Sequence, residues 1–531
     1  MKKKIVSLAL AALLAAAACT MAACDKTRTP NTPGGSDPVN NRIVISTVTG
    51  TGIPQAFQAV EKGYEAIHPE IDVVVELKPA NGYSQWLSNE ITADDPAPDI
   101  VDVSTMAASS RGRTVNYDEY IDEISPYSNK PWREQFDYEA QIPNPFAEGT
   151  DSLSFERTQV VWVYNKAIFE EYSLEPPKTW DELLAVCETL QSNGIQPLGI
   201  SGTFDGFYAG ATGHLFQIYN DQVTRDMINV VRAQEGDYCY DPEKDGVWEY
   251  DPTDPYNDDA GYVTVNPVRL MKAIQDGTYA ADSPGTKFVT EQLHRLLPYY
   301  AGGENYYGTD YPQSSFYRGD VAMMVEGAYA VPRYYAALEK ELAMAEDDPN
   351  YTLSIMQFEV GTFNMPSMEG QYVLAPARTI EVPVGFYGII DKGKENTDKV
   401  IDFMMYFSSK EGFTLYQQAL IENGGVPTGS VLIDGVELPE KYAEMYADLV
   451  PIGNCQKSPC QTIARGAAND VQASVREWYT YTQDYFQGEI DIDEWARLHK
   501  VNVMKYFDDS LRAAGIGYND LQYPQNRPTG N

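Results

Sequence analysis

The amino-acid sequence predicts an α/β protein with mostly parallel sheets, divided into two lobes. Short apolar strands alternate with amphipathic helices over residues 43–104, and the same alternation returns over residues 158–201. Strands and helices that alternate through short connections form parallel sheets covered by helices. The chain has 531 residues, 43% of them hydrophobic, which is ample for a large core and too long for one compact domain.

Five elements account for the first alternation. Each strand is a short apolar run, and each helix has apolar residues at helical spacing and is followed by a proline or a polar turn. In chain order the prediction is a strand at 43–47, a helix at 55–70, a strand at 71–78, a helix at 82–95 and a strand at 98–104.

The second alternation has the clearest helix start in the chain. A strand at 158–165 precedes a helix at 179–194, for which Thr179 and Glu182 form a capping box and Gly194 is a stop signal. Further elements follow: a strand at 196–201, a helical and loop-rich region at 203–310 with an acidic, proline-rich insertion at 237–260, strands at 321–327 and 384–390, a helical stretch at 396–419, and two or three long helices within 461–515.

The first 23 residues are typical of an export signal. Three lysines precede an apolar, alanine-rich stretch that ends in small residues before Cys24, and polar residues follow. The ending resembles a bacterial lipobox, so we expect Cys24 to be lipidated, with Cys19 as the alternative lipid site. Ordinary cleavage of the signal and a retained anchor helix are further alternatives. Residues 24–41 then form a flexible tether, because they are too polar and rich in Pro and Gly to be buried.

Net charge and cysteine usage restrict the partners. The formal charge of −38 disfavours nucleic acid and anionic membrane surfaces, and favours neutral or cationic small partners. In an exported protein, Cys455 and Cys460 could pair across a short loop, and the sequence leaves that disulfide open. The four histidines are too scattered to suggest a zinc site. No catalytic pair and no phosphate-binding loop can be singled out, so we expect neither an enzyme nor a cofactor.

Four stretches resemble the extracellular solute-binding proteins of ABC importers, family 1, the carbohydrate-binding branch, and one of them is the N-terminal strand–helix unit through "PDIV" at 98–101. The most specific is "VYNKAIFEEYSLEPPKTWDELLAVCETLQSNGIQPLGISG" at 163–202. "FYRGDVAMMVEGAYAVPRY" at 316–334 is similar to a second motif of that family, with Tyr329 in place of an aromatic residue that is usually Trp. "FNMPSMEG" and "PVGFYGIIDKGKENTDKVIDFMMYFSSKEG" within 363–412 make the third.

The resemblance implies two doubly wound lobes joined by a multi-segment hinge, the Venus-flytrap fold of periplasmic binding proteins. Lobe 1 would comprise 43–157 plus 372–428, lobe 2 would comprise 158–371 plus 429–518, and 519–531 would be a loose tail. It implies a monomeric lipoprotein on the outer face of a bacterial cell membrane that captures an oligosaccharide between its lobes and delivers it to an ABC permease. Two alternatives remain: a surface glycan-capture or sensor lipoprotein that is not coupled to import, and a binder of a non-sugar solute.

Candidate ligand contacts follow from strand ends and from the resemblance. Solutes favour the crevice beyond the carboxyl ends of parallel strands. The aromatic Tyr329 is the strongest candidate, since an aromatic residue at this position stacks on a sugar in the resembling family. The others are Thr49 and Thr51 after the first strand, Ser104, Thr105 and Met106 after the third, Arg157 and Thr158 where the chain is expected to cross between lobes, and Phe204, Asp205 and Phe207 after the strand at 196–201.

Two further groups have mainly structural interpretations. Asp241, Glu243, Asp245 and Glu249 match part of a calcium-loop pattern, but Pro252 stands where its last ligand should be, so an acidic solvated loop is favoured over a metal site. We expect Trp86, Trp180, Trp478 and Trp495 to be core residues because they lie at helical spacings.

Overall fold

The computed structural model describes residues 41–106, 110–142, 144, 149–208, 210–308, 312–447, 449–458, 462–467 and 471–530, without the side chains of Asp205, Tyr208 and Lys457. The predicted signal and tether, with Cys19 and Cys24, lie outside these residues, and so does Cys460. Within them, no helix is both long enough and apolar enough to cross a membrane.

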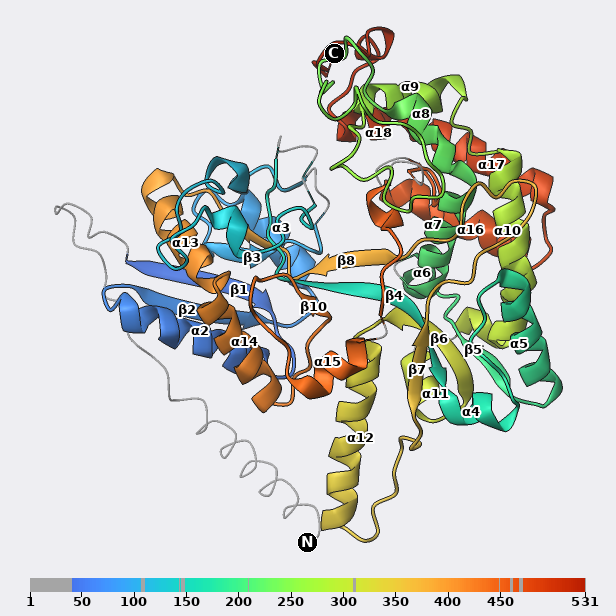
Figure 1. The fold of residues 1–531 in the computed structure, drawn as a ribbon, viewed down its shortest axis with the longest axis horizontal. Helices are drawn as coiled ribbons and strands as arrows, with labels where there is room; N and C mark the ends of the chain where they lie inside the picture. The colour runs from blue at the N-terminus through green and yellow to red at the C-terminus, as the bar shows by residue number, and fades with distance from the viewer. Residues whose placement is uncertain are drawn as a thin grey trace, which may run out of the picture. The chain divides into compact units, whose positions relative to one another are not determined.

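The first sheet has the strand order β2-β1-β3-β9, and Figure 1 labels β1, β2 and β3 of this sheet. β1 (Arg42–Val48) pairs in parallel with β2 (Asp72–Lys78) and with β3 (Ile100–Asp102), and β9 (Tyr387–Ile389) is antiparallel to β3. The helices of this lobe are α2 (Ile53–Ile67), α3 (Tyr83–Thr92), α13 (Lys394–Phe407) and α14 (Lys410–Glu422). β1, α2, β2, α3 and β3 follow one another near the predicted positions, so the first predicted alternation is confirmed. Apolar residues of α2, α13 and α14 form one core with β1.

A long strand, β4 (Glu156–Asn165), joins the two lobes. Its first half pairs with β8 (Ile380–Val384) and β10 (Ser430–Val431), and its second half pairs with β6 (Val321–Gly327) and β7 (Val360–Phe363). Phe155, just before β4, packs in the core of the first lobe, whereas Trp162 packs in the core of the second. β4, β8 and β10 are therefore the segments that cross between the lobes.

The second sheet has the strand order β10-β4-β6-β5, with β5 (Gln196–Gly199) parallel to β6. The helices of this lobe are α4 (Lys166–Glu171), α5 (Trp180–Ser192), α6 (Phe204–Tyr208), α7 (Ala211–Thr224), α8 (Ile228–Val231), α9 (Pro267–Asp276), α10 (Pro284–Leu296), α11 (Pro312–Tyr317), α12 (Ala330–Asp347), α15 (Glu440–Tyr446), α16 (Gln472–Phe486), α17 (Ile492–Lys505) and α18 (Phe507–Ala513). Short 3-10 helices are η2 (Tyr117–Glu119), η3 (Trp132–Gln135), η4 (Arg225–Met227), η5 (Tyr299–Ala301), η6 (Gly303–Gly308), η7 (Cys455–Lys457) and η10 (Asp520–Gln522).

The capping box that starts α5 is confirmed. The Thr179 hydroxyl accepts a hydrogen bond from the Glu182 N–H, and the Glu182 carboxylate accepts one from the Thr179 N–H. Trp180, Trp478 and Trp495 are buried in the core of the second lobe, as expected. Trp86 is only partly buried, and the Lys78 ammonium lies 4.9 Å from its ring, so the core prediction holds for three of the four tryptophans.

Two predicted elements differ in extent from the structure. The strand expected at 384–390 is the shorter β9, and β8, which was not predicted, ends just before Gly385, whose φ of 73° interrupts the extended run. The helix expected at 396–419 is α13 and α14, because the Ser409 hydroxyl accepts a hydrogen bond from the Gly412 N–H and begins a new helix. The predicted helices within 461–515 are α16, α17 and α18.

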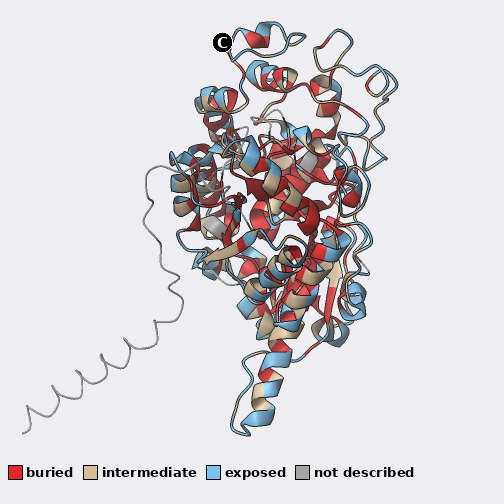
Figure 2. Ribbon diagram, turned by 90° about the vertical axis from the view of Figure 1, so that its left-hand side faces the viewer, coloured by how far each residue is buried: buried red, intermediate tan, exposed pale blue. Residues whose placement is uncertain are grey.

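Figure 2 shows buried residues concentrated within the layers, while the far end of α12 and the loop after it are exposed. The end of the chain is held more firmly than expected. The Asp520 carboxylate accepts hydrogen bonds from the N–H groups of Gly517, Thr529 and Gly530, so residues 517–530 are not a loose tail.

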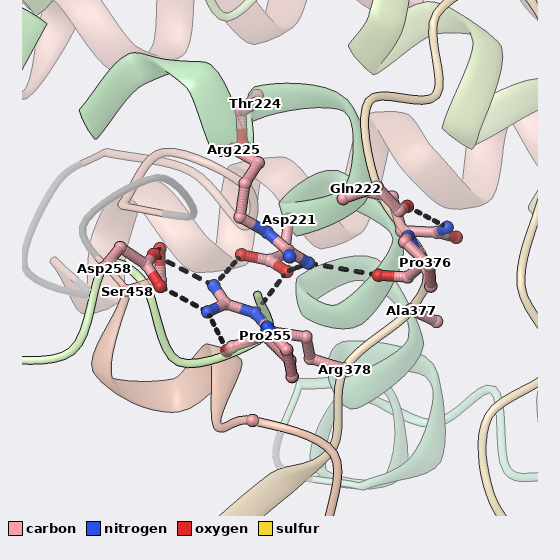
Figure 3. A network of polar contacts seen from close by, with 12 residues as sticks. Asp221, Gln222, Thr224, Arg225, Pro255, Asp258, Pro376, Ala377, Arg378 and Ser458 are labelled. Atoms are coloured by element: carbon pink, nitrogen blue, oxygen red, sulfur yellow. Dashed lines mark hydrogen bonds and ion pairs between the residues drawn. The ribbon is translucent and has the colours of Figure 1, made fainter. Parts of the chain in front are cut away.

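A buried ion network holds the acidic insertion against the second lobe (Figure 3). The Arg378 guanidinium lies between the carboxylates of Asp221 on α7 and Asp258 of the insertion, and also donates to the Pro255 carbonyl. Arg225 also donates a charged hydrogen bond to Asp221, at 2.5 Å. Since Arg378 lies two residues before β8, the network fixes the insertion next to a crossing strand.

Candidate ligand-binding cleft

The carboxyl ends of β1 and β3 present four of the predicted contact residues. Thr49 and Thr51 are exposed in the loop after β1, and Ser104 and Thr105 are exposed after β3. The two strands pair directly and in parallel, so both loops leave the same edge of the sheet. This edge therefore offers several hydroxyl groups to a solute.

Met106 differs from its neighbours at this edge. Its side chain is 8% exposed and packs in a cluster with Leu87 and Val101. Its carbonyl accepts a hydrogen bond from the Arg111 guanidinium at 3.0 Å. Met106 is therefore a core residue, and its predicted role as a ligand contact is corrected.

The start of β4 places Arg157 and Thr158 where the chain crosses between the lobes. The Arg157 guanidinium lies 3.5 Å from the Glu381 carboxylate on β8 and 3.7 Å from that of Asp137. Thr158 is buried, and its hydroxyl has no hydrogen-bond partner in the described part of the chain. Arg157 thus ties two crossing strands together, while Thr158 retains an unused polar atom.

The residues after β5 are divided between surface and core. Phe204 is partly buried, with the Arg476 guanidinium 4.2 Å from its ring and the Tyr479 ring at 5.4 Å. Phe207 has no exposed surface and packs against Trp478 in the core, so its predicted ligand contact is corrected. The side chain of Asp205 lies outside the described residues.

Tyr329 lies at the start of α12, immediately after β6. Its hydroxyl donates a hydrogen bond to the Glu326 carboxylate at 2.8 Å, and the Arg333 guanidinium lies 4.1 Å from the centre of its ring. Burial, followed by the Glu326 charge, raises the pKa of Tyr329, so the hydroxyl remains a donor. The structure therefore covers one ring face with a cation, in a cation–π contact.

A cavity of about 430 Å³ lies between elements of the two lobes. First-lobe residues in its wall come from the loop after β1 and from α14, and second-lobe residues come from α12. The wall residues are Gly50, Thr51, Ile53, Arg333, Ala336, Ala337, Lys340, Tyr416, Leu420, Gly424, Gly425, Val426 and Thr428. The volume falls within the roughly 300–1,000 Å³ of small-molecule sites. Another hollow, of about 740 Å³ and lined in part by Tyr299, Tyr307 and Phe486, has walls from the second lobe alone.

The cavity brings together only part of the predicted set. Thr51 lines it directly, and Tyr329 adjoins it through Arg333. Gly52, beside Thr51, has a φ of 75°, and a Cβ at this position would collide with the Leu420 carbonyl of α14, so glycine is required where the loop meets that helix. Ser104, Thr105, Phe204 and Arg157 are not among its lining residues.

Sequence reasoning missed Glu326, Arg333 and Lys340. Glu326 accepts hydrogen bonds from Tyr329 and from the Gly327 N–H, and the two cations line the cavity. Arg333 was detectable in principle, because it lies four residues after Tyr329 on a helix and so on the same face. Lys340 has no such signal in the sequence.

In the calcium-like stretch of the insertion, the carboxylates of Asp241 and Asp245 accept hydrogen bonds from backbone N–H groups. Asp245 is 3% exposed and accepts hydrogen bonds from the N–H groups of Asp241 and Thr264. The Asp241 carboxylate accepts one from the Glu243 N–H, at 2.9 Å. In the described ranges, no group of three or more His, Cys, Asp or Glu residues is arranged to hold a metal ion.

Comparison with protein families gives one match over most of the chain. A family model described as bacterial extracellular solute-binding protein matches residues 47–412. This range includes α2, the crossing strand β4, Tyr329 and α12.

Individual relatives and solved structures are more distant. A maltotriose-binding protein of Pyrococcus abyssi is 26% identical over 213 residues, which cover 38% of this chain and 42% of that protein. An uncharacterized ABC transporter extracellular-binding protein of Pyrococcus horikoshii is 27% identical over 207 residues, or 38% and 46% of the two chains. The chain thus spans less than half the length of these curated relatives.

Among solved structures, the bacterial solute receptor AcbH, described as having a preference for β-D-galactopyranose, matches with a TM-score of 0.55. The match covers 88% of this chain and 100% of that one at 15% identity, and so shows a shared fold.

Proposed function

The chain belongs to the bacterial extracellular solute-binding proteins, and from this membership we propose that it captures a carbohydrate between its two lobes and delivers it to an ABC permease. Proteins of this family act outside the cytoplasm and bind solutes instead of converting them. The maltotriose-binding relative and the galactose-preferring receptor support a sugar as the solute.

The cavity between the lobes is the observation that carries the proposal. One wall comes from the loop after β1 and the other from α12, so a solute held there contacts both lobes at once. A solute that binds the closed form better than the open form shifts the protein toward closure. β4, β8 and β10 are the segments that such a movement would bend.

We assign the sugar contacts to residues that remain exposed or retain polar atoms. Thr49, Thr51, Ser104 and Thr105 would exchange hydrogen bonds with sugar hydroxyls on the first lobe. Tyr329 would contribute its ring from the second lobe, with Phe204 farther along that lobe. Arg157 and Thr158 would act at the crossing, where the Thr158 hydroxyl has no partner in the described part of the protein. Met106 and Phe207 are not included, because both are buried in cores.

We further propose that Cys24 carries a lipid and that residues 25–41 form the tether between the membrane and the folded part. A single lipid chain binds membranes only marginally, so a second acyl chain or anchor would be needed. Cys24→Ser should release the protein from the membrane fraction of the native host. Release by Cys19→Ser instead would assign the lipid to Cys19.

Calorimetry against a panel of neutral and acidic oligosaccharides, combined with small-angle scattering, tests the binding function. The expected result is roughly micromolar affinity for a short oligosaccharide, together with a smaller radius of gyration on binding. Binding of long glycans without compaction would favour surface capture. Release of reducing ends would identify an enzyme, and binding of no glycan would overturn the proposal.

A further inference from the structure

The cavity between the lobes has a charge opposite to that of the chain. The sequence contains 77 acidic and 39 basic residues. The cavity wall nevertheless contains two cations, Arg333 and Lys340, and no Asp or Glu. An anion that enters the cavity therefore meets positive charge first, in spite of the net charge of the protein.

Both cations lie on one face of α12. They are seven residues apart, which is about two helical turns. Ala336 and Ala337 line the wall between them, and their short side chains leave the space beside the cations open. Both residues are exposed, and neither cationic side chain forms a hydrogen bond or an ion pair with a side chain or backbone group of the described residues. The neighbouring Glu339 is paired with Lys441 of α15, at 2.6 Å.

Two carboxylates near the cavity, those of Glu326 and Glu156, accept hydrogen bonds from other groups. The oxygens of Glu326 accept hydrogen bonds from the Tyr329 hydroxyl, the Gly327 N–H and the Gln313 amide. Glu156 is buried and accepts hydrogen bonds from Gln417 and from the Thr428 N–H. Burial also raises the pKa of Glu156 above the ordinary carboxyl value. Neither carboxylate forms an ion pair with Arg333 or Lys340.

The rest of the wall suits the neutral part of a sugar. Thr51 and Thr428 supply hydroxyl groups, and Gly50, Gly424 and Gly425 also line the wall. Leu420 and Val426 add apolar surface. A ligand that matches both walls carries hydroxyl groups at one side and an acid group at the other.

We propose that the carbohydrate taken by this cleft is an acidic oligosaccharide, with the carboxylate of a uronic acid unit held by Arg333 and Lys340. The planar guanidinium suits a carboxylate, since its two N–H groups can donate to both oxygens. The Tyr329 ring packs against the Arg333 guanidinium in the cation–π contact, so Tyr329 positions this cation. The inference rests on the proposed function and specifies the class of sugar.

The test measures affinities of the full mature chain for matched pairs of oligosaccharides. Suitable pairs are trigalacturonate with galactotriose, and glucuronate-substituted xylotriose with plain xylotriose, within a wider panel of acidic and neutral members. The expected result is at least about tenfold tighter binding of the acidic member of one pair. Arg333→Gln and Lys340→Gln should each reduce that acid-to-neutral ratio at least threefold, and the double variant should abolish it.

Lys62→Gln is the matched control, because Lys62 is an exposed cation of α2 outside the cavity wall, and it should leave the ratio unchanged. Arg333 and Lys340 are exposed, so their variants should fold, which circular dichroism verifies. Binding of neutral members only, or an acid preference unaffected by both variants, overturns the inference while the proposed function stands. Binding of no member overturns both.

Discussion

Arg378→Met tests whether the ion network of Figure 3 stabilises the second lobe. Arg378 is 1% exposed and donates to Asp221 at 2.6 and 3.0 Å, to Asp258 at 3.0 Å and to the Pro255 carbonyl at 3.0 Å. Methionine retains much of the side-chain volume but removes every donor. Asp221 keeps its ion pair with Arg225, whereas Asp258 loses its ion pair with Arg378 and keeps the hydrogen bond from the Ser458 hydroxyl, at 2.8 Å.

The expected loss in the free energy of unfolding follows from the number of carboxylates that Arg378→Met leaves unpaired. Removing one partner of a buried pair costs about 3–5 kcal/mol, and because Arg225 still compensates Asp221, we expect roughly 3 kcal/mol. Urea unfolding followed by tryptophan fluorescence and by far-ultraviolet circular dichroism measures the loss. A two-lobed chain need not unfold in one step, so coincidence of the two probes must be checked first.

The surface pair Arg318–Asp320 supplies the control. Both side chains are about half exposed, and exposed pairs contribute less than about 1 kcal/mol, so Arg318→Met should be nearly neutral. Equal effects of Arg378→Met and Arg318→Met would refute the reasoning. Burial alone would raise the pKa of Asp258, but hydrogen bonds and the charge of Arg378 lower it. This stabilisation is complete above the ordinary carboxyl pKa and is lost as pH falls through the lowered value. The difference in the free energy of unfolding between wild type and Arg378→Met should therefore become smaller in acid.

Three other predictions concern the site and the core. Tyr329→Ala should weaken oligosaccharide binding at least about tenfold, because both the ring and the support for Arg333 are removed; an unchanged Kd in calorimetry would place the site elsewhere. Phe207→Ala should lower the free energy of unfolding by about 3–5 kcal/mol with little change in Kd, whereas the reverse pattern would restore Phe207 as a contact. Burial lowers the pKa of both His214 and His499 from 6.5 to about 4. The unfolded chain then binds protons that the folded chain does not, so stability should fall as pH drops from 6.5 to 4, by roughly 3 kcal/mol per histidine. His499→Asn should flatten this part of the stability curve, and an unaltered slope would contradict the assignment.

Local signals were sufficient for most of the fold. The capping box at Thr179 and the apolar run at 321–327 predicted α5 and β6 closely, since both depend on neighbours in the sequence. The division between α13 and α14 was missed, although Ser409 is a good N-cap, because the apolar periodicity continues across it. The anchoring of residues 517–530 depends on Asp520 binding backbone groups up to ten residues away, for which no local pattern exists.

The site was harder to predict. The end of a strand indicates which loop lies near a ligand, but it does not indicate which side chains of that loop face the ligand and which face the core. The sequence places both Phe204 and Phe207 after β5, and only the packing of α6 against α16 separates a partly buried ring from a fully buried one. The same holds for Met106, which follows β3 like Thr105 but turns into a core cluster. Arg333 was missed because its importance depends on a long-range fact, the approach of the loop at Thr51, as well as on its local contact with Tyr329.

The negative net charge of the chain disfavours an anionic ligand, whereas the two cations of the cavity favour one. Which effect is stronger depends on the distance between the ligand and the charged groups. At physiological salt the Debye length is about 8 Å, so most of the 77 carboxylates are screened from a ligand in the cavity. A carboxylate in contact with Arg333 is not screened in this way, and at about 4 Å it gains from about 1 kcal/mol in bulk water to about 4 kcal/mol at an effective dielectric constant of 20. A long polyanion such as nucleic acid must still lie along the acidic surface, which the net charge opposes. The net charge therefore argues against nucleic acid without arguing against a small acidic sugar. The acid-to-neutral affinity ratio should accordingly be measured near 0.15 M salt, because at low salt the repulsion of the entire surface would mask the attraction of two cations.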